Sequence, residues 1–173
     1  MDFFSIDYLK KGTAKQQEVY DLLTTHQILA HLHEFTPVVV GTFPLDIAID
    51  TSDIDIACSF VDLAHFQQVV QDHFQAYTGF NEVILNQRNP LTYVANFEIA
   101  NFPVEIFAQT IPVTAQYGYR HLCIEYEILQ KQGNAFKEKV KACKQAAWKT
   151  EPAFATLLNL KGDPYESLLQ YIP

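Results

Sequence analysis

One stretch limits what this chain can fold into: a short apolar run, a small-residue turn, a connector and an acid-rich segment. In order these are residues 38–40, the pair Gly41-Thr42, residues 43–52 and the segment Asp53-Ile54-Asp55-Ile56. Alternate residues of a β-strand face the same side, about 6.5–7 Å apart along the backbone. We therefore expect Asp53 and Asp55 to project together, while the two isoleucines point into a core.

Paired carboxylates of this kind call for a partner. They repel each other unless a proton or a cation lies between them. A hard divalent cation bound through oxygen, most naturally Mg²⁺, would relieve that repulsion. Farther along, Glu105 stands between Val104 and Ile106, so we expect it alone on the polar face of another strand. If the two strands are neighbours, Asp53, Asp55 and Glu105 form a metal-binding cluster.

The remaining pattern mixes extended and helical segments and predicts an α+β fold. Strands are expected at 38–40, 53–58, 82–85, 92–99 and 103–108, and helices at 13–23, 25–32, 62–74, 114–131, 134–148, 150–161 and from 163 onward. Thr13 and Gln16 have the spacing of a capping box, and Asp62 looks like a helix cap. In the connector, Pro44 could lie in the first turn of a short helix, whereas Ile47, Ala48 and Ile49 could equally be extended. We expect a mixed sheet flanked by helices, with a helical C-terminal third.

Composition narrows the class of protein further. Hydrophobic residues make up 49% of the chain, enough for the core of one compact unit, with an α/β core at 1–111 and a helical part at 112–173. The net charge of −8 argues against general binding to nucleic acid or to anionic membranes. The three cysteines are far apart, as in reduced cytosolic proteins. No run approaches the roughly 20 apolar residues of a membrane span, so we expect a cytoplasmic protein.

On these residues the sequence resembles the nucleotidyltransferase superfamily, which has the fold of DNA polymerase beta. The superfamily pattern is a hydrophobic run, Gly-Gly or Gly-Ser, about ten residues, Asp-x-Asp on a strand and a later third acid. Gly41-Thr42, the pair Asp53 and Asp55, and Glu105 match it. The chain also resembles a small uncharacterised bacterial family of such proteins. The matching segments there are Pro112-Val113-Thr114, Tyr119-Arg120-His121 and Gly162-Asp163-Pro164-Tyr165.

The resemblance implies an activity. Asp53, Asp55 and Glu105 would be the catalytic acids and would hold Mg²⁺, as one ion or two. Gly41 and Thr42 would contact the terminal phosphates of a nucleoside triphosphate. The nucleoside monophosphate would pass to a hydroxyl group of a small molecule or a protein, with Glu105 acting as, or in place of, a general base. The expected partners are thus a nucleotide and a small-molecule or protein acceptor, and we do not expect nucleic acid among them.

The connector departs from the superfamily pattern. Active members usually carry basic residues there, whereas residues 43–52 contain no Lys or Arg and do contain Asp46 and Asp50. Two extra negative charges beside a site for a polyanion would oppose phosphoryl chemistry, which depends on charge neutralisation. A cation could come instead from Arg120, since arginine binds phosphate in a bidentate way. Its neighbour His121 is either a base or a polar core residue.

Several alternatives remain open from the sequence. The fold could be kept in a non-catalytic binding or regulatory module, or the acids could merely solvate one face of a sheet. Phosphatases also use Asp-x-Asp, but they prefer a small hydroxyl residue or valine where Ala57 stands. The helical face of Lys137, Lys141 and Lys144 is either solvated or a nucleic-acid patch. The tyrosines at 117, 119 and 126 either stack on a base or pack in the core.

Overall fold

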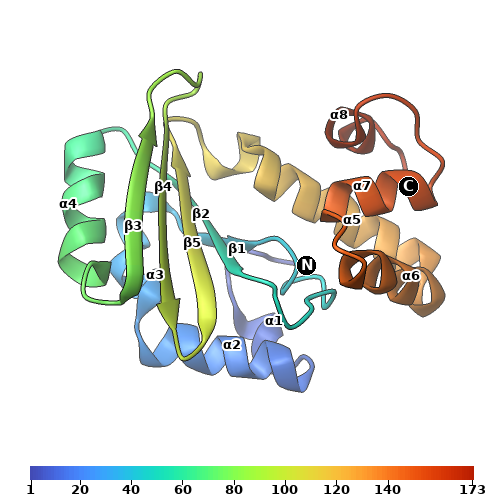
Figure 1. Ribbon diagram of the computed structural model, residues 1–173, viewed down its shortest axis with the longest axis horizontal. Helices are drawn as coiled ribbons and strands as arrows, with labels where there is room; N and C mark the ends of the chain where they lie inside the picture. The colour runs from blue at the N-terminus through green and yellow to red at the C-terminus, as the bar shows by residue number, and fades with distance from the viewer.

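A five-stranded mixed sheet lies at the centre of the computed structural model, which covers residues 1–173 (Figure 1). The strands are β1 (Val38–Val40), β2 (Ile54–Ser59), β3 (Thr78–Leu85), β4 (Thr92–Ile99) and β5 (Phe102–Gln109), in the order β1-β2-β5-β4-β3. Strands β2 and β5 run parallel, and every other pair is antiparallel. The predicted meander of the last three strands is confirmed, as is the α+β class with its mixed sheet.

Eight helices surround the sheet. They are α1 (Asp7–Lys10), α2 (Ala14–Thr25), α3 (Ile28–His31), α4 (Leu63–Phe74), α5 (Tyr117–Gln132), α6 (Asn134–Gln145), α7 (Thr150–Leu157) and α8 (Pro164–Leu169). The predicted capping box of Thr13 and Gln16 begins α2, and the Asp62 carboxylate accepts hydrogen bonds from the first turn of α4. None of these helices has the length and apolar character that a membrane crossing requires.

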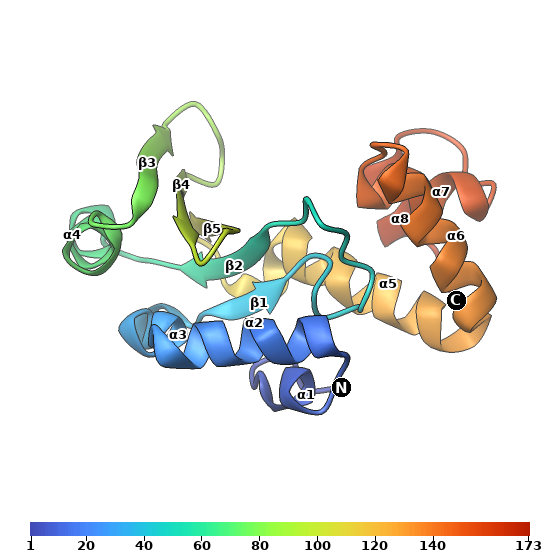
Figure 2. The ribbon, with the colours of Figure 1, turned by 60° about the horizontal axis from the view of Figure 1, so that its bottom comes forward.

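Side-chain alternation in β2 and β5 divides the interior into two cores. Ile54, Ile56 and Ile106 are fully buried in a core with residues of α2 and α4. Ala57 belongs to a second core, on the other face of the sheet, with residues of α5–α8. Because residues of one parity face one side, Asp55 and Glu105 face the C-terminal helices. Figure 2 shows α2 on one side of the sheet and α5 on the other.

A hydrogen-bonded carboxylate fixes α4 against the sheet. Glu82 of β3 accepts hydrogen bonds from the Tyr93 hydroxyl at 2.6 Å, from Gln71 at 2.8 Å and from Gln67. Tyr93 is fully buried, and its ring packs edge-on against Phe66 of α4. Burial raises the pKa of Glu82, but the three hydrogen bonds outweigh burial, so the pKa lies below its usual range. Side-chain hydrogen bonds thus join α4 to β3 and β4.

The structure differs from the expected element boundaries at several places. Strand β3 begins at Thr78 and not at residue 82, α3 covers only Ile28–His31, and α7 ends at Leu157 and not at residue 161. Residues 113–115 form a 3₁₀ turn, so α5 begins at Tyr117. Helix α6 ends at Gln145, because Ala147 has a positive φ of 64°. The connector does not contain the helix that Pro44 could have begun: residues 41–46 are consecutive turns that bury Phe43 and Leu45, and residues 47–49 belong to no helix or strand. The division at residue 111 stays a prediction, and the second core joins side chains from both parts.

Candidate active site

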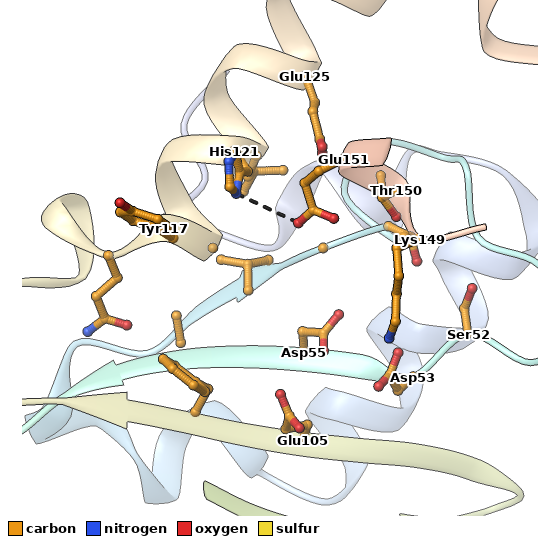
Figure 3. A pocket seen from close by; sticks show the side chains of 18 of the residues that line it. Ser52, Asp53, Asp55, Glu105, Tyr117, His121, Glu125, Lys149, Thr150 and Glu151 are labelled. Carbon is orange, nitrogen blue, oxygen red and sulfur yellow. Dashed lines mark ion pairs between the residues drawn. The ribbon is translucent and has the colours of Figure 1, made fainter. Parts of the chain in front are cut away.

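A cleft of about 820 Å³ lies between the sheet face that carries the acids and the C-terminal helices (Figure 3). The strand ends and the Gly41 turn supply one wall, and α5, the α6–α7 loop and the start of α7 supply the other. The predicted residues that line it are Gly41, Thr42, Asp53, Asp55, Glu105 and His121. All three acids therefore open into one cleft, as the spacing predicted.

The parallel pairing of β2 and β5 places two of the acids side by side. Asp55 and Glu105 are register partners, and neighbouring strands lie about 4.8 Å apart. Asp53 comes just before β2 and is exposed. Figure 3 shows the three carboxylates near one another on the floor of the cleft. The prediction that the Glu105 strand lies beside the Asp-x-Asp strand is confirmed, while the metal-binding and catalytic roles stay predictions.

The carboxylates of the cleft are partly buried and repel one another. Burial raises the pKa of Asp55, and the charges of Asp53 and Glu105 raise it further. The pKa of Glu105 is also raised, first by burial and then by Asp53, with Lys149 opposing the shift. Protonation or a cation would relieve this repulsion.

The donor set fits Mg²⁺, but it is not arranged as a finished site. No three His, Cys, Asp or Glu side chains are placed so that they could hold a metal ion. The chemistry of the residues nevertheless suits it, because Asp53, Asp55 and Glu105 offer only oxygen ligands and repel one another. When Mg²⁺ is bound, the three acids would hold it, and the ion would act as a Lewis acid that neutralises their charge.

The turn after β1 leaves room for the acids. Gly41 has φ of +70°, and a Cβ built on it would lie 2.2 Å from Oδ2 of Asp55. Val40 pairs with Asp55 in the sheet, which brings the turn to this position. The hydroxyl of Thr42 is buried and has no hydrogen-bond partner. The contact of Gly41 and Thr42 with the phosphates of a nucleotide stays a prediction.

Positive charge reaches the cleft from three residues, of which the sequence had singled out only Lys144, as part of a lysine face. Lys144, Lys149 and Arg88 line it, and Figure 3 shows Lys149 pointing toward Asp53. Burial lowers the pKa of Lys144, against the charges of Asp53 and other nearby acids. Lys144 donates to the Thr150 hydroxyl at 3.3 Å and forms no ion pair within 4.0 Å of any acid. The ammonium charge of Lys144 is therefore not paired with any single carboxylate of the cleft.

The two acids of the connector point away from the cleft. Asp46 forms an ion pair with Lys137 and accepts a hydrogen bond from the Thr13 hydroxyl. Asp50 lies 3.1 Å from Lys15. Neither acid lines the cleft. The expectation that they place extra negative charge beside the site is therefore corrected, because the turns of residues 41–46 direct them to other partners.

The helical residues predicted to assist divide between two surroundings. Arg120 is exposed, lies 5.6 Å from the Tyr117 ring centroid, and does not line the cleft. His121 does line it, and is buried. Its Nε2 lies 3.0 Å from the Tyr165 carbonyl oxygen, and its Nδ1 lies 3.7 Å from Oε1 of Glu151. The structure thus brings His121, and not Arg120, to the cleft.

Sequence reasoning missed three further lining residues. Glu125 follows His121 by four positions on α5, a spacing that places both side chains on one helix face. Glu151 lies in the first turn of α7. Trp148, the only tryptophan of the chain, is 45% exposed on the α6–α7 loop. Only the spacing of Glu125 from His121 was a usable signal, because the other two positions depend on how α7 packs.

The fold and the acid pair define a protein of the polymerase beta-like nucleotidyltransferase fold. Similar solved structures include the Cid1 poly(U) polymerase bound to MgGTP, at 13% identity with a TM-score of 0.56, covering 80% of this chain and 46% of that one. The GLD-2/RNP-8 complex matches at 16% identity with a TM-score of 0.54, over 88% of this chain and 60% of that one. The chain thus spans about half the length of these structures.

The family model of DUF4269, a domain of unknown function, matches residues 21–171. The chain therefore belongs to the DUF4269 family. No curated protein matches the sequence.

One expectation about partners is wrong. The net charge of −8 led us to expect that nucleic acid is not a partner. However, the solved structures that share this fold include a poly(U) polymerase and the polymerase core of TRAMP, an RNA surveillance complex. The latter matches at 12% identity with a TM-score of 0.50, over 94% of this chain and 50% of that one. Net charge averages the whole surface, so it does not by itself exclude a nucleic-acid partner.

Proposed function

We propose that this protein is a Mg²⁺-dependent nucleotidyltransferase that moves a nucleoside monophosphate from a nucleoside triphosphate to a hydroxyl group. The observation that carries the proposal is the register of Asp55 with Glu105 on adjacent parallel strands, at the floor of a cleft that also holds Asp53. The acceptor hydroxyl would belong to a small molecule or a protein, and the similarity to RNA polymerases adds the end of an RNA.

The residues of the cleft have separate roles in this proposal. The acceptor oxygen bonds to the α-phosphorus, the bond from that phosphorus to the bridging oxygen breaks, and pyrophosphate leaves. Glu105 would take the hydroxyl proton, and the burial that raises its pKa supports this role, because a base works best with a pKa near the pH of the reaction. Lys144 and Lys149 bind the phosphates that depart, and the Thr42 hydroxyl donates to one of their oxygens.

The test measures pyrophosphate release and label transfer from α-³²P nucleoside triphosphates with Mg²⁺. Acceptors are offered in three pools: short RNAs, a small-molecule extract and a protein extract. Asp53→Asn should abolish transfer, because it removes one of the carboxylates that would hold the metal. Asp50→Asn is the matched control, since Asp50 is exposed and lies outside the cleft. Undiminished transfer by the Asp53 variant would refute the proposal.

A second candidate is a non-catalytic module that binds a partner through the same face. The absence of a preformed three-ligand metal site favours it. A thermal-shift screen of nucleoside triphosphates separates the two candidates, because a ligand that binds only the folded state raises the melting temperature. A shift that requires both Mg²⁺ and nucleotide supports the enzyme, and no shift with any nucleotide supports the module.

A further inference from the structure

The short loop between α6 and α7 begins with a Schellman motif, the common hydrogen-bonded ending of a helix. The N–H of Ala147 donates to the Lys144 carbonyl at 2.9 Å, and the N–H of Trp148 donates to the Cys143 carbonyl at 3.1 Å. Glycine is the usual residue at the left-handed position of this motif, but Ala147 occupies it here, with φ of 64°. Immediately after this turn, Trp148 and Lys149 line the cleft.

Lys149 is the member of this loop that faces the acids. It is exposed, and its side chain reaches down toward Asp53 (Figure 3). Burial and the charge of Asp53 raise the pKa of Glu105, and the Lys149 ammonium opposes that rise. The ammonium nevertheless forms no ion pair within 4.0 Å of any carboxylate oxygen. Lys149 therefore supplies positive charge to two of the acids without being fixed to either one.

The second lysine of the cleft is held differently. Lys144 projects from α6 itself, is partly buried, and donates to the Thr150 hydroxyl at 3.3 Å. Lys149 has no such hydrogen bond and stands on an exposed loop, where the chain is generally more mobile than in the elements it connects. Of the two lysines, Lys149 is therefore the one that is free to change its partner.

The acids that Lys149 faces are also the predicted ligands of Mg²⁺. Like charges repel at short distance, and the repulsion is stronger in a partly buried cleft than in water. An ammonium above Asp53 and a metal ion held by the same carboxylate therefore oppose each other. The acids also do not converge on one point as a finished three-ligand site would, which is the arrangement expected when a lysine supplies part of their counter-charge.

A bound triphosphate would offer Lys149 a second partner. Its phosphate oxygens carry more negative charge than a single carboxylate, and charge-assisted hydrogen bonds to phosphate are strong. The lysine side chain has four flexible carbons and a compact charge, so it can reach a new partner with its backbone in place. The acids and the phosphates would thus compete for one ammonium.

We propose that Lys149 is a switching residue, which neutralises Asp53 and Glu105 in the metal-free protein and moves to a phosphate when nucleotide and metal ion are bound together. The inference rests on the proposed function for what occupies the cleft. A metal ion alone then binds weakly, because it must displace the ammonium. The nucleotide strengthens ion binding by drawing Lys149 away, and the ion strengthens nucleotide binding by the same factor.

The experiment titrates the full chain with Mn²⁺ in the absence of nucleotide and follows the paramagnetic resonance signal of the free ion. Mn²⁺ accepts the same oxygen ligands as Mg²⁺. Lys149→Met should bind Mn²⁺ about tenfold more tightly than the wild type, within the usual range of coupling between two sites. Lys149→Arg keeps the charge and should bind as the wild type does. Lys161→Met is the control, because Lys161 is exposed and lies outside the cleft.

A second titration adds a non-hydrolysable ATP analogue. The advantage of Lys149→Met should then disappear, because in the wild type the phosphates have already drawn Lys149 away from the acids. Chelation of the ion by the analogue is the same for both proteins, so the difference between them reports on Lys149 alone.

Each outcome supports or overturns the inference. Equal Mn²⁺ affinity of Lys149→Met and the wild type without nucleotide overturns it, as does Lys149→Arg behaving like Lys149→Met. An advantage of Lys149→Met that persists unchanged with the analogue also overturns it, because Lys149 would then not change its partner.

Label transfer is measured separately and distinguishes this inference from the proposed function. Transfer by the wild type, with no effect of Lys149→Met on Mn²⁺ binding, refutes the inference alone. Tighter Mn²⁺ binding by Lys149→Met in a protein that transfers no label refutes the proposed function alone. No Mn²⁺ binding by any variant overturns both.

Discussion

Replacing Gly41 with alanine tests whether the turn exists to make room for Asp55. Gly41 has φ of +70°, and the new Cβ would lie 2.2 Å from Oδ2 of Asp55 and 3.2 Å from its Cγ. The backbone conformation costs an L-residue about 1–2 kcal/mol. In a chain of this size that lowers the melting temperature by about 2–8 °C. The clash itself adds little to this loss, because the flexible end of the Asp55 side chain can rotate away.

Gly79 offers a matched control for the backbone term. It also has φ of +70°, but nothing lies within 4 Å of a Cβ built on it. Gly79→Ala and Gly41→Ala should therefore lose similar stability. Only Gly41→Ala moves the Asp55 carboxylate, so only that variant should lose Mg²⁺-dependent nucleotide binding, by about tenfold or more, as expected for a displaced charged ligand.

The assay combines urea denaturation with titration of MgATP, monitored by Trp148 fluorescence. The stability change and the affinity change are read from the same preparations of the two variants. If Gly41→Ala binds MgATP as the wild type does, the close approach to Asp55 has no role in the site. Equal loss of nucleotide binding in both variants would also refute the reasoning, because it would make backbone strain the cause.

Three further predictions follow from charges described above. Because the pKa of Glu82 is lowered in the folded protein, the stability that its carboxylate provides is present above its unfolded pKa and is lost as the pH falls through its folded pKa. Tyr93→Phe removes one hydrogen bond to this carboxylate and should lower the free energy of unfolding by about 1 kcal/mol at pH 7. The loss should be smaller at pH 3, with both values measured by urea denaturation. Burial and nearby acids raise the pKa of Asp55, so the ionisation of this group destabilises the fold above its unfolded pKa. Asp55→Asn should therefore be more stable than the wild type at pH 8, and the difference should vanish toward pH 3 in the same assay. Lys144→Met should weaken MgATP binding by about tenfold or more in calorimetry, while exposed Lys139→Met on the same helix stays within about twofold.

The sheet around the acids was within reach of sequence reasoning, because strand alternation is strong there. A buried face is predicted on both strands by the apolar residues Ile54 and Ile56 on one and Val104 and Ile106 on the other. All four side chains are buried. With that face fixed, the acid between each pair must point to the opposite side. The pairing of the two strands followed once both acids were required at one site.

The helical wall was harder to predict, since helix periodicity does not say what a polar face meets. Consecutive helix residues point about 100° apart, so Arg120 faces solvent while its neighbour His121 faces the cleft. Lys137 and Lys144 seemed equivalent, yet one pairs with Asp46 and the other lies among the acids. Glu125 is buried, and its burial depends on how the C-terminal helices pack, which no local pattern encodes.

The parallel pairing of β2 with β5 has a consequence for how the protein reaches its working form. Along the chain α4, β3 and β4 lie between these two strands, and β5 occupies the centre of the sheet. Such distant pairings form late, since loop closure opposes them until neighbouring contacts exist. Asp55 and Glu105 meet only at that step. Gain of metal-dependent nucleotide binding during refolding would therefore time the completion of the sheet, and partly folded chains would have no binding activity.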